Sequence, residues 1–169
     1  NHRDTVVFLK VKPGPQTAME PEIFEEYLAG FKKAYPKKFV SEDEIFSHIR
    51  RGDHIFVASG CGEPQYLVKA MIRYVESHPK AFFDAEIIHV YSLGLAPYTG
   101  VKYKANFRHN SFFIGNSTRD SINAGMADYT PISLSQVPSL LASGVVQIDV
   151  ALIQTSMPDE HHYLSLGVS

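Results

Sequence analysis

Strand-like and helix-like segments alternate along this chain from residue 54 onward, and this alternation constrains the fold more than any other feature. Apolar runs of strand length are found at 54–59, 87–91, 112–114 and 145–155, and amphipathic segments lie between them at 64–75, 118–124 and 135–142. A repeated order of strand, helix and strand is typical of a parallel sheet covered by helices. The pattern therefore predicts an α/β fold with an open, mostly parallel sheet and helices on both faces.

The first part of the chain does not follow this pattern. Residues 6–18 predict an extended arm, because Pro13 and Pro15 prevent a continuous regular element. Apolar side chains at helical spacing then predict a helix over 19–35, which Pro36 ends.

A second, shorter helix is predicted directly before the repeating part. Ser41 and Glu44 have the spacing of a capping box, and Gly52 stands where a left-handed C-terminal cap is expected. At the other end, 163–168 predicts a strand with no helix after it. We therefore divide the chain into an arm and helix at 1–40 and an α/β domain at 41–169, which we expect to be a piece of a larger protein.

The composition excludes several classes of protein. The chain holds 16 Lys and Arg against 18 Asp and Glu, so it has no basic excess with which to bind nucleic acid. Its single cysteine, Cys61, excludes an internal disulfide and a zinc site with two or more thiolates. No apolar stretch reaches the roughly 18 residues of a membrane span, and no signal peptide is recognisable. We expect a cytoplasmic protein that does not bind membranes.

The first candidate site follows the strand-like run at 54–59. Ligands of open parallel sheets bind beyond the carboxyl ends of the strands. Gly60 and Gly62 would let the backbone approach a ligand closely, and the helix behind them offers unpaired N–H groups. A tight connection without any ligand explains the two glycines equally well.

Two side chains in this turn are candidates for chemistry. Cys61 lies near a helix end that would stabilise a thiolate, but the sequence favours a packed and inert residue because no histidine stands at a matching spacing. Glu63, also near that helix end, suits an anchor or a cap better than a general acid.

The second candidate site follows the run at 112–114. Asn116 or one of the two residues after it would cap the next helix, which places Arg119 in the first turn. The helix dipole does not favour a cation there, so Arg119 is expected to face either a negative ligand or Asp120 or Asp128. The ion pair is the simpler interpretation.

The third candidate site follows the run at 145–155 and contains Asp159, His161 and His162. Adjacent residues of a strand point to opposite faces, so the two imidazoles make a poor joint metal site. A hydrogen-bonded loop is favoured, and no metal site is predicted.

Four runs carry a resemblance to a known family. They are GCGEPQ at 60–65, SFFIGNSTR at 111–119, GMADYTPI at 125–132 and DVALIQTSMPDEH at 149–161. Together with 41–52 they resemble the N-terminal domain of the acetyl-CoA hydrolase/transferase family, which are class I CoA-transferases that include the 4-hydroxybutyrate and succinyl-CoA:acetate enzymes. The resemblance covers roughly residues 40–169. One departure is His162, where the family usually has glycine; a positive φ there would make histidine the costlier residue.

The resemblance implies a Rossmann-type domain of the CoA-transferase and NagB-like kind. Such a domain would form one wall of a cleft in a two-domain enzyme that moves CoA between acyl-CoA and a small carboxylate, or hydrolyses acyl-CoA. In the family a glutamate attacks the thioester, and CoA then attacks the mixed anhydride to leave a glutamyl-CoA thioester. That glutamate belongs to the C-terminal domain, so no catalytic residue is assigned here.

The expected partners are acyl-CoA, a carboxylate and the C-terminal domain, with CoA thioester as substrate and no permanently bound cofactor. Whether the protein forms a homodimer is left open. The residues expected to bind substrate are Gly60, Cys61, Gly62, Glu63, Gln65, Asn116, Arg119, Asp159 and His161. The main alternative is a non-catalytic α/β module that binds a phosphorylated small molecule through the glycine turn. A purely structural domain that promotes assembly is a third candidate.

Overall fold

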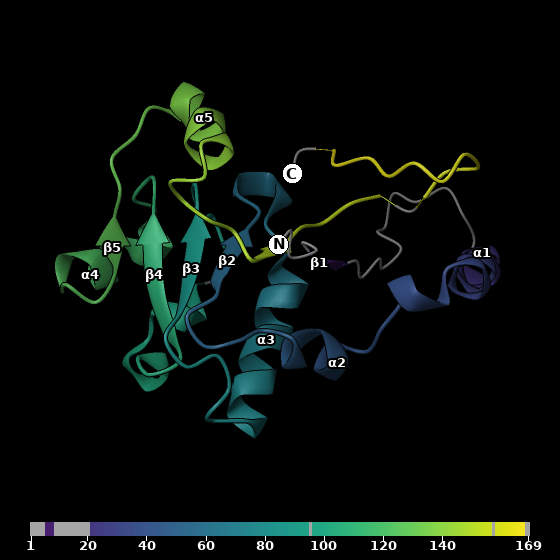
Figure 1. Cartoon of the computed structure of the whole chain (residues 1–169), viewed down its shortest axis with the longest axis horizontal. Helices are drawn as coiled ribbons and strands as arrows, with labels where there is room; N and C mark the ends of the chain where they lie inside the picture. The colour runs from purple at the N-terminus through teal and green to yellow at the C-terminus, as the bar shows by residue number, and fades with distance from the viewer. Residues whose placement is uncertain (1–5, 9–20, 95, 157, 168–169) are drawn as a thin grey trace.

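The sheet has six strands in the part of the chain that the structure describes. This structure is a computed structural model, and it describes residues 6–8, 21–94, 96–156 and 158–167. The strands are β1 (Val6–Phe8), β2 (His54–Val57), β3 (Ala85–His89), β4 (Phe107–Ser111), β5 (Asp128–Tyr129) and β6 (Val150–Leu152). They lie in the order β1-β6-β2-β3-β4-β5, and each of these neighbouring pairs is parallel (Figure 1). The predicted parallel sheet is confirmed.

Helices connect these strands. The α-helices are α1 (Pro21–Ala34), α2 (Glu42–Ser47), α3 (Gln65–Ser77), α4 (Asn116–Asn123) and α5 (Val137–Ala142). Short 3-10 helices are η1 (Pro36–Lys38), η2 (Gly60–Gly62), η3 (Pro97–Thr99), η4 (Val101–Tyr103) and η5 (Leu134–Gln136). Of the helices in the described ranges, none combines the length and the apolar character needed to cross a bilayer.

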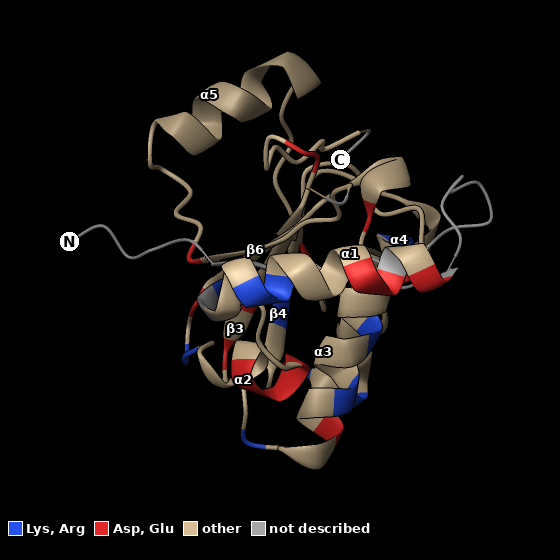
Figure 2. Cartoon of the chain, turned by 90° about the vertical axis from the view of Figure 1, so that its right-hand side faces the viewer, with Lys and Arg blue, Asp and Glu red and all other residues tan. Residues whose placement is uncertain are grey.

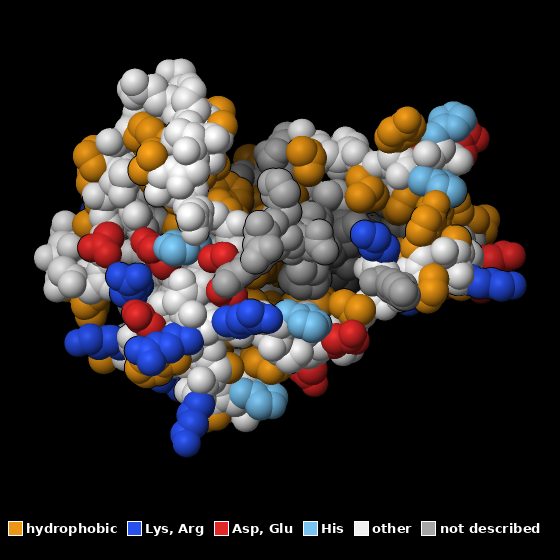
Figure 3. Space-filling model, in the orientation of Figure 1, with side chains coloured by type: hydrophobic (Ala, Val, Ile, Leu, Met, Phe, Trp, Pro, Cys, Tyr) orange, Lys and Arg blue, Asp and Glu red, His pale blue; other side chains and the backbone are white. Residues whose placement is uncertain are grey.

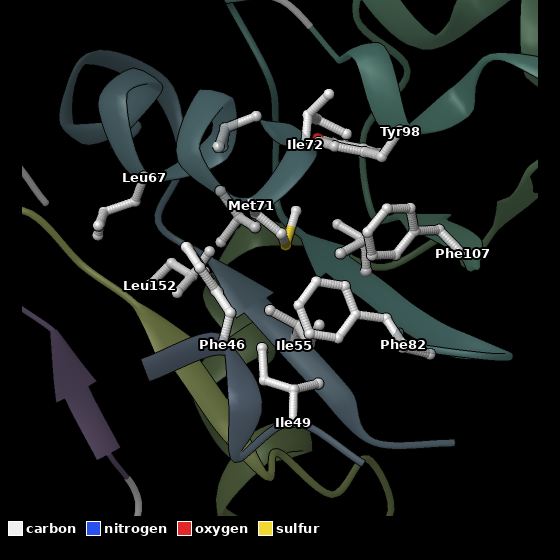
Figure 4. Packing of buried hydrophobic residues seen from close by; sticks show 14 of the residues in the cluster. Phe46, Ile49, Ile55, Leu67, Met71, Ile72, Phe82, Tyr98, Phe107 and Leu152 are labelled. Atoms are coloured by element: carbon white, nitrogen blue, oxygen red, sulfur yellow. The ribbon is translucent and has the colours of Figure 1, made fainter. Parts of the chain in front are cut away.

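The core has one hydrophobic cluster on each face of the sheet. Because side chains alternate along a strand, Ile87 joins the cluster under α2 and α3, whereas its neighbour Ile88 joins the cluster under α5. Figure 4 shows Phe46 of α2, Met71 of α3 and Ile55 of β2 meeting in the first cluster. Helices therefore cover both faces, and the predicted fold class is confirmed.

The short helix predicted before β2 is present as α2, with its start confirmed and its end corrected. The Ser41 hydroxyl accepts a hydrogen bond of 3.1 Å from the backbone N–H of Glu44, as the capping spacing predicted. Gly52 has the expected left-handed φ of 75°, but α2 already ends at Ser47. The cap assignment was wrong because four residues separate Gly52 from the helix end, and the glycine serves the turn into β2.

Three strand predictions were wrong in position or existence. The strand predicted at 112–114 is not formed. Its place is taken by β4, which ends at Ser111, one residue before the predicted range begins. The long strand predicted at 145–155 is only Val150–Leu152, and 163–167 forms no strand. In the first two cases apolar side chains pack from loops, for example Phe112 and Ile148 in the core cluster under α5, whereas Tyr163, Leu164 and Leu166 are exposed. Most of the predicted arm, 9–18, lies outside the described residues.

Helix α1 lies at the edge of the molecule and contacts the C-terminal segment 158–167. It carries Glu22 in its first turn and Lys32 and Lys33 in its last, as the charges in Figure 2 show. The Tyr27 hydroxyl donates a 2.9 Å hydrogen bond to the Pro158 carbonyl. Hydrophobic side chains gather on the surface over this region (Figure 3). On α1, Phe31 is buried, whereas Ile23 is exposed.

His162 stands where the family that the sequence resembles usually has glycine. Its φ is 67°, so the position does adopt the left-handed conformation that favours glycine. The imidazole ring packs edge-on against Phe31 at 5.4 Å and against Tyr35 at 5.3 Å between ring centroids. These contacts, and a hydrogen bond to the Tyr35 hydroxyl, offset the conformational cost of a non-glycine residue.

Candidate functional site

Three loops meet beyond the carboxyl ends of β2, β3 and β4, whose arrows point the same way in Figure 1. The Ser59 hydroxyl accepts a 2.9 Å hydrogen bond from the N–H of Val90, and the Gly60 N–H donates a 2.9 Å bond to the Tyr91 carbonyl. These contacts join the loop after β2 to the loop after β3. Ser117 at the start of α4 reaches the Ser92 carbonyl at 3.5 Å, which brings in the loop after β4.

Glu63 holds the first two loops together. Its side chain is 7% exposed and accepts hydrogen bonds from the Ser92 hydroxyl at 2.9 Å and from the N–H groups of Leu93 at 3.1 Å and Gly94 at 2.9 Å. The carboxylate faces the loop after β3 and makes no cap to α3. An anchor was predicted and is present, but its target is a neighbouring loop, which the sequence did not indicate.

We expect Glu63→Gln to lower the free energy of unfolding by about 1 kcal/mol, because charge-assisted hydrogen bonds become neutral ones. Denaturant unfolding measures the change. Glu76 of α3 accepts its hydrogen bonds from Lys102 and Tyr103 at an exposed position, so Glu76→Gln is the matched control and should change stability much less. Equal effects of the two substitutions would contradict the anchor role of Glu63.

The glycine turn forms one 3-10 turn, η2. Gly60 has a φ of 62°, which glycine adopts without steric cost. Cys61 is exposed, so the expectation that it packs as a small buried residue was wrong: the turn points its side chain outward. Gly62 is buried behind it.

Gln65, the first residue of α3, lies against Gly94. A Cβ atom built on Gly94 would stand 2.0 Å from the Gln65 side-chain nitrogen, so a larger residue at 94 would require the Gln65 side chain to move. Gln65 and Glu63 therefore both meet the loop after β3.

The start of α4 differs from its prediction. Gly115 is the cap residue, and no side chain caps the helix. Asn116 and Arg119 are exposed in its first turn. Among the described residues, Arg119 forms no ion pair with Asp120 or Asp128, so the simpler interpretation of this cation was wrong: the three charges remain solvated.

Asp159 and His161 are not brought to these loops. Asp159 accepts hydrogen bonds of 2.9 Å from the N–H groups of His161 and Tyr163, which closes a turn in the C-terminal segment beside α1 (Figure 1). The hydrogen-bonded loop predicted there is present. Within the described ranges, no group of three His, Cys, Asp or Glu side chains could hold a metal ion.

Sequence reasoning missed a buried polar cluster below the three loops. His89 ends β3 and His109 lies in β4, with 1% and 2% of their surfaces exposed. Burial lowers the pKa of His89 to about 4, and burial together with the neighbouring His89 lowers the pKa of His109 to about 3. Both imidazoles are therefore neutral near pH 7. The available signal was His89 in the strand run predicted at 87–91, because the segment that holds His109 was not predicted as a strand.

The chain is similar in sequence to several known proteins. Residues 25–169 match the acetyl-CoA hydrolase/transferase N-terminal domain family. A 4-hydroxybutyrate coenzyme A transferase of Clostridium kluyveri is 37% identical over 139 residues, which cover 82% of this chain and 32% of that protein. A succinyl-CoA:acetate/propanoyl-CoA:succinate CoA transferase of Fasciola hepatica is 37% identical over 135 residues, or 80% of this chain and 27% of that protein.

A solved structure has the same fold. RipA from Yersinia pestis superposes with a TM-score of 0.69 at 24% identity, over 82% of this chain and 33% of that one. The chain thus spans about a third of the length of the proteins it resembles.

Proposed function

Because this chain belongs to the acetyl-CoA hydrolase/transferase family as an N-terminal domain, we propose that it forms one wall of an active-site cleft in a larger enzyme. That enzyme would move CoA between an acyl-CoA thioester and a carboxylic acid, or hydrolyse the thioester. The meeting of three strand-end loops, two of them joined by Glu63 and the third by Ser117, carries the proposal, since open parallel sheets bind ligands beyond the carboxyl ends of their strands.

The reaction would proceed through a glutamyl-CoA thioester on a glutamate outside this chain. Glu63 is unsuited to that role because three hydrogen bonds already occupy its two oxygens. Its task is to fix the wall against which the thioester lies. CoA enters as a substrate and not as a bound cofactor.

The exposed groups of the wall would contact the substrate. Gly60 and Cys61 would present the turn to the substrate, with Gly62 buried behind them, and Gln65 would act from its place against Gly94 in the loop after β3. Asn116 and Arg119 lie in the uncapped first turn of α4, where the N–H groups and the guanidinium favour a carboxylate or a phosphate. Asp159 and His161 would act in the C-terminal segment, apart from this wall. The cytoplasmic location and the state of assembly stay predictions.

The protein that carries this chain should turn over acetyl-CoA when acetate or succinate is supplied, and the isolated chain 1–169 should not.

Arg119→Lys keeps the charge but loses the planar fork, so we expect kcat/KM to fall by about tenfold. Chromatographic assay of the acyl-CoA species measures both.

Arg108→Lys is the matched control, since Arg108 is exposed in β4 and contacts Asp84 at 3.1 Å away from the loops. It should leave turnover unchanged. Binding of phosphorylated compounds without any turnover would favour the non-catalytic module instead.

A further inference from the structure

Leu93 places a large apolar side chain where the three strand-end loops meet, and 59% of its surface is exposed. It follows Ser92, whose carbonyl oxygen accepts the 3.5 Å hydrogen bond from the Ser117 hydroxyl at the start of α4. Among the described residues at 58–64, 90–96 and 112–115, Leu93 is the one large hydrophobic residue that is exposed. The sequence gave no signal for a role of this residue.

The backbone at Leu93 is held by a buried carboxylate. Glu63 accepts from the Leu93 N–H at 3.1 Å and from the Gly94 N–H at 2.9 Å, and it also accepts from the Ser92 hydroxyl at 2.9 Å. These hydrogen bonds are strong because Glu63 is charged and shielded from water. Single exposed leucines are common on protein surfaces, but this one is presented by backbone that a buried side chain fixes.

An apolar side chain held in this way favours an apolar ligand group. Contact with such a group removes apolar surface from water, and a side chain that is already in place loses little freedom on binding. On the other side of the contact between Ser92 and Ser117, the N–H groups of the first turn of α4 and the Arg119 guanidinium favour an anionic group. A ligand that spans both sides therefore carries an apolar part and an anionic part. An acyl-CoA thioester has both.

We propose that Leu93 contacts the apolar part of the acyl-CoA, which consists of the pantetheine arm and the acyl chain on either side of the thioester, and raises the affinity for it. The proposal rests on the proposed function and adds to it a residue that sets the affinity for one part of the substrate.

Ligand binding by the protein that carries this chain tests the contact without turnover. Where the pantetheine arm lies against Leu93, Leu93→Ala should raise the Kd of CoA by about fivefold. Where the acyl chain lies there instead, the Kd of CoA stays the same and that of butyryl-CoA rises by about fivefold. Leu93→Met keeps the apolar volume, so its Kd values should be close to those of the unsubstituted protein. Isothermal titration calorimetry measures each Kd.

One control ligand and one control variant accompany the test. Adenosine 3′,5′-bisphosphate lacks both the pantetheine arm and the acyl chain, so Leu93→Ala should not weaken its binding. Val101→Ala should leave the Kd values of CoA and butyryl-CoA unchanged. Val101 is 69% exposed in η4, where the adjacent Lys102 contacts Glu76 in the last turn of α3, away from the loops.

Unchanged Kd values of both CoA and butyryl-CoA in Leu93→Ala would overturn the proposal. Equal weakening of the binding of CoA and of adenosine 3′,5′-bisphosphate would overturn it as well, because the substitution would then act on the loop and not on an apolar contact. Absence of CoA and butyryl-CoA binding by the unsubstituted protein would overturn both this proposal and the proposed function.

Kinetics separate the contact from a structural role of the side chain. A contact made equally in the bound substrate and in the transition state affects KM, so Leu93→Ala should raise KM for acyl-CoA by about fivefold with kcat unchanged. A fall in kcat with KM unchanged would overturn the contact. Weaker CoA or butyryl-CoA binding in Leu93→Ala, combined with no turnover by the unsubstituted protein, would overturn the proposed function and leave the contact standing.

Discussion

Between pH 7 and pH 5 the free energy of unfolding is expected to fall by about 4 kcal/mol, because two buried histidines stay neutral in the folded state. Burial lowers the pKa of His89 from 6.5 to about 4, and the pKa of His109 from 6.5 to about 3. Below pH 6.5 the unfolded chain therefore binds two protons that the folded chain does not. The contribution of the two histidines to the free energy of unfolding is complete above pH 6.5 and declines as the pH falls toward 4. Urea unfolding at a series of pH values measures the decline.

Replacing one of the two histidines separates this effect from general acid sensitivity. His109→Gln removes one titrating group, so the loss between pH 7 and pH 5 should be about half as large, near 2 kcal/mol. His48→Gln, at an exposed position, should leave the loss as it is in the unsubstituted chain. If His109→Gln also leaves the pH dependence intact, the two buried histidines do not cause it.

Gly115→Ala is expected to lower the free energy of unfolding by about 3 kcal/mol. The backbone at Gly115 has an ordinary φ of −89°, so conformational strain is not the cause. A Cβ atom there would lie 2.6 Å from the Ser92 carbonyl oxygen and 3.2 Å from the Tyr91 ring. Because the nearer atom belongs to the backbone, the loops after β3 and β4 must separate. Denaturant unfolding measures the loss.

Gly30→Ala is the matched control. Gly30 lies within α1, and a Cβ atom there meets no other atom within 4 Å. Alanine should raise the free energy of unfolding by about 0.5 to 1 kcal/mol, since it reduces the freedom of the unfolded chain. A Gly115→Ala variant as stable as the unsubstituted chain would show that the loops part at little cost.

Local patterns predicted the helices well because the signals for a helix lie within a few residues. The apolar spacing after Pro64 predicted α3, and Ser41 with Glu44 predicted the start of α2. Both depend on contacts between neighbours three or four residues apart. The alternation of these helices with strands was enough to predict the parallel sheet, since parallel strands require such crossovers.

Strand β4 was misplaced because its sequence is polar. His109 and Ser111 are buried in it, and they are tolerated only because β3 brings His89 against both of them. The apolar side chains that follow, which suggested the strand, pack from a loop instead. Burial of a polar strand depends on partners that local sequence does not reveal.

The candidate site shows the same division. The rule for parallel sheets predicted that the turns at Gly60 and at Gly115 would lie at one edge, and they do. The loop after β3, which touches both turns, had no signal of its own. The glycine turn and an anchoring role for Glu63 are local features and were predictable from sequence. The target of the Glu63 carboxylate was decided only by the tertiary structure, because its donors are backbone groups about thirty residues away whose position depends on how β2 and β3 pair.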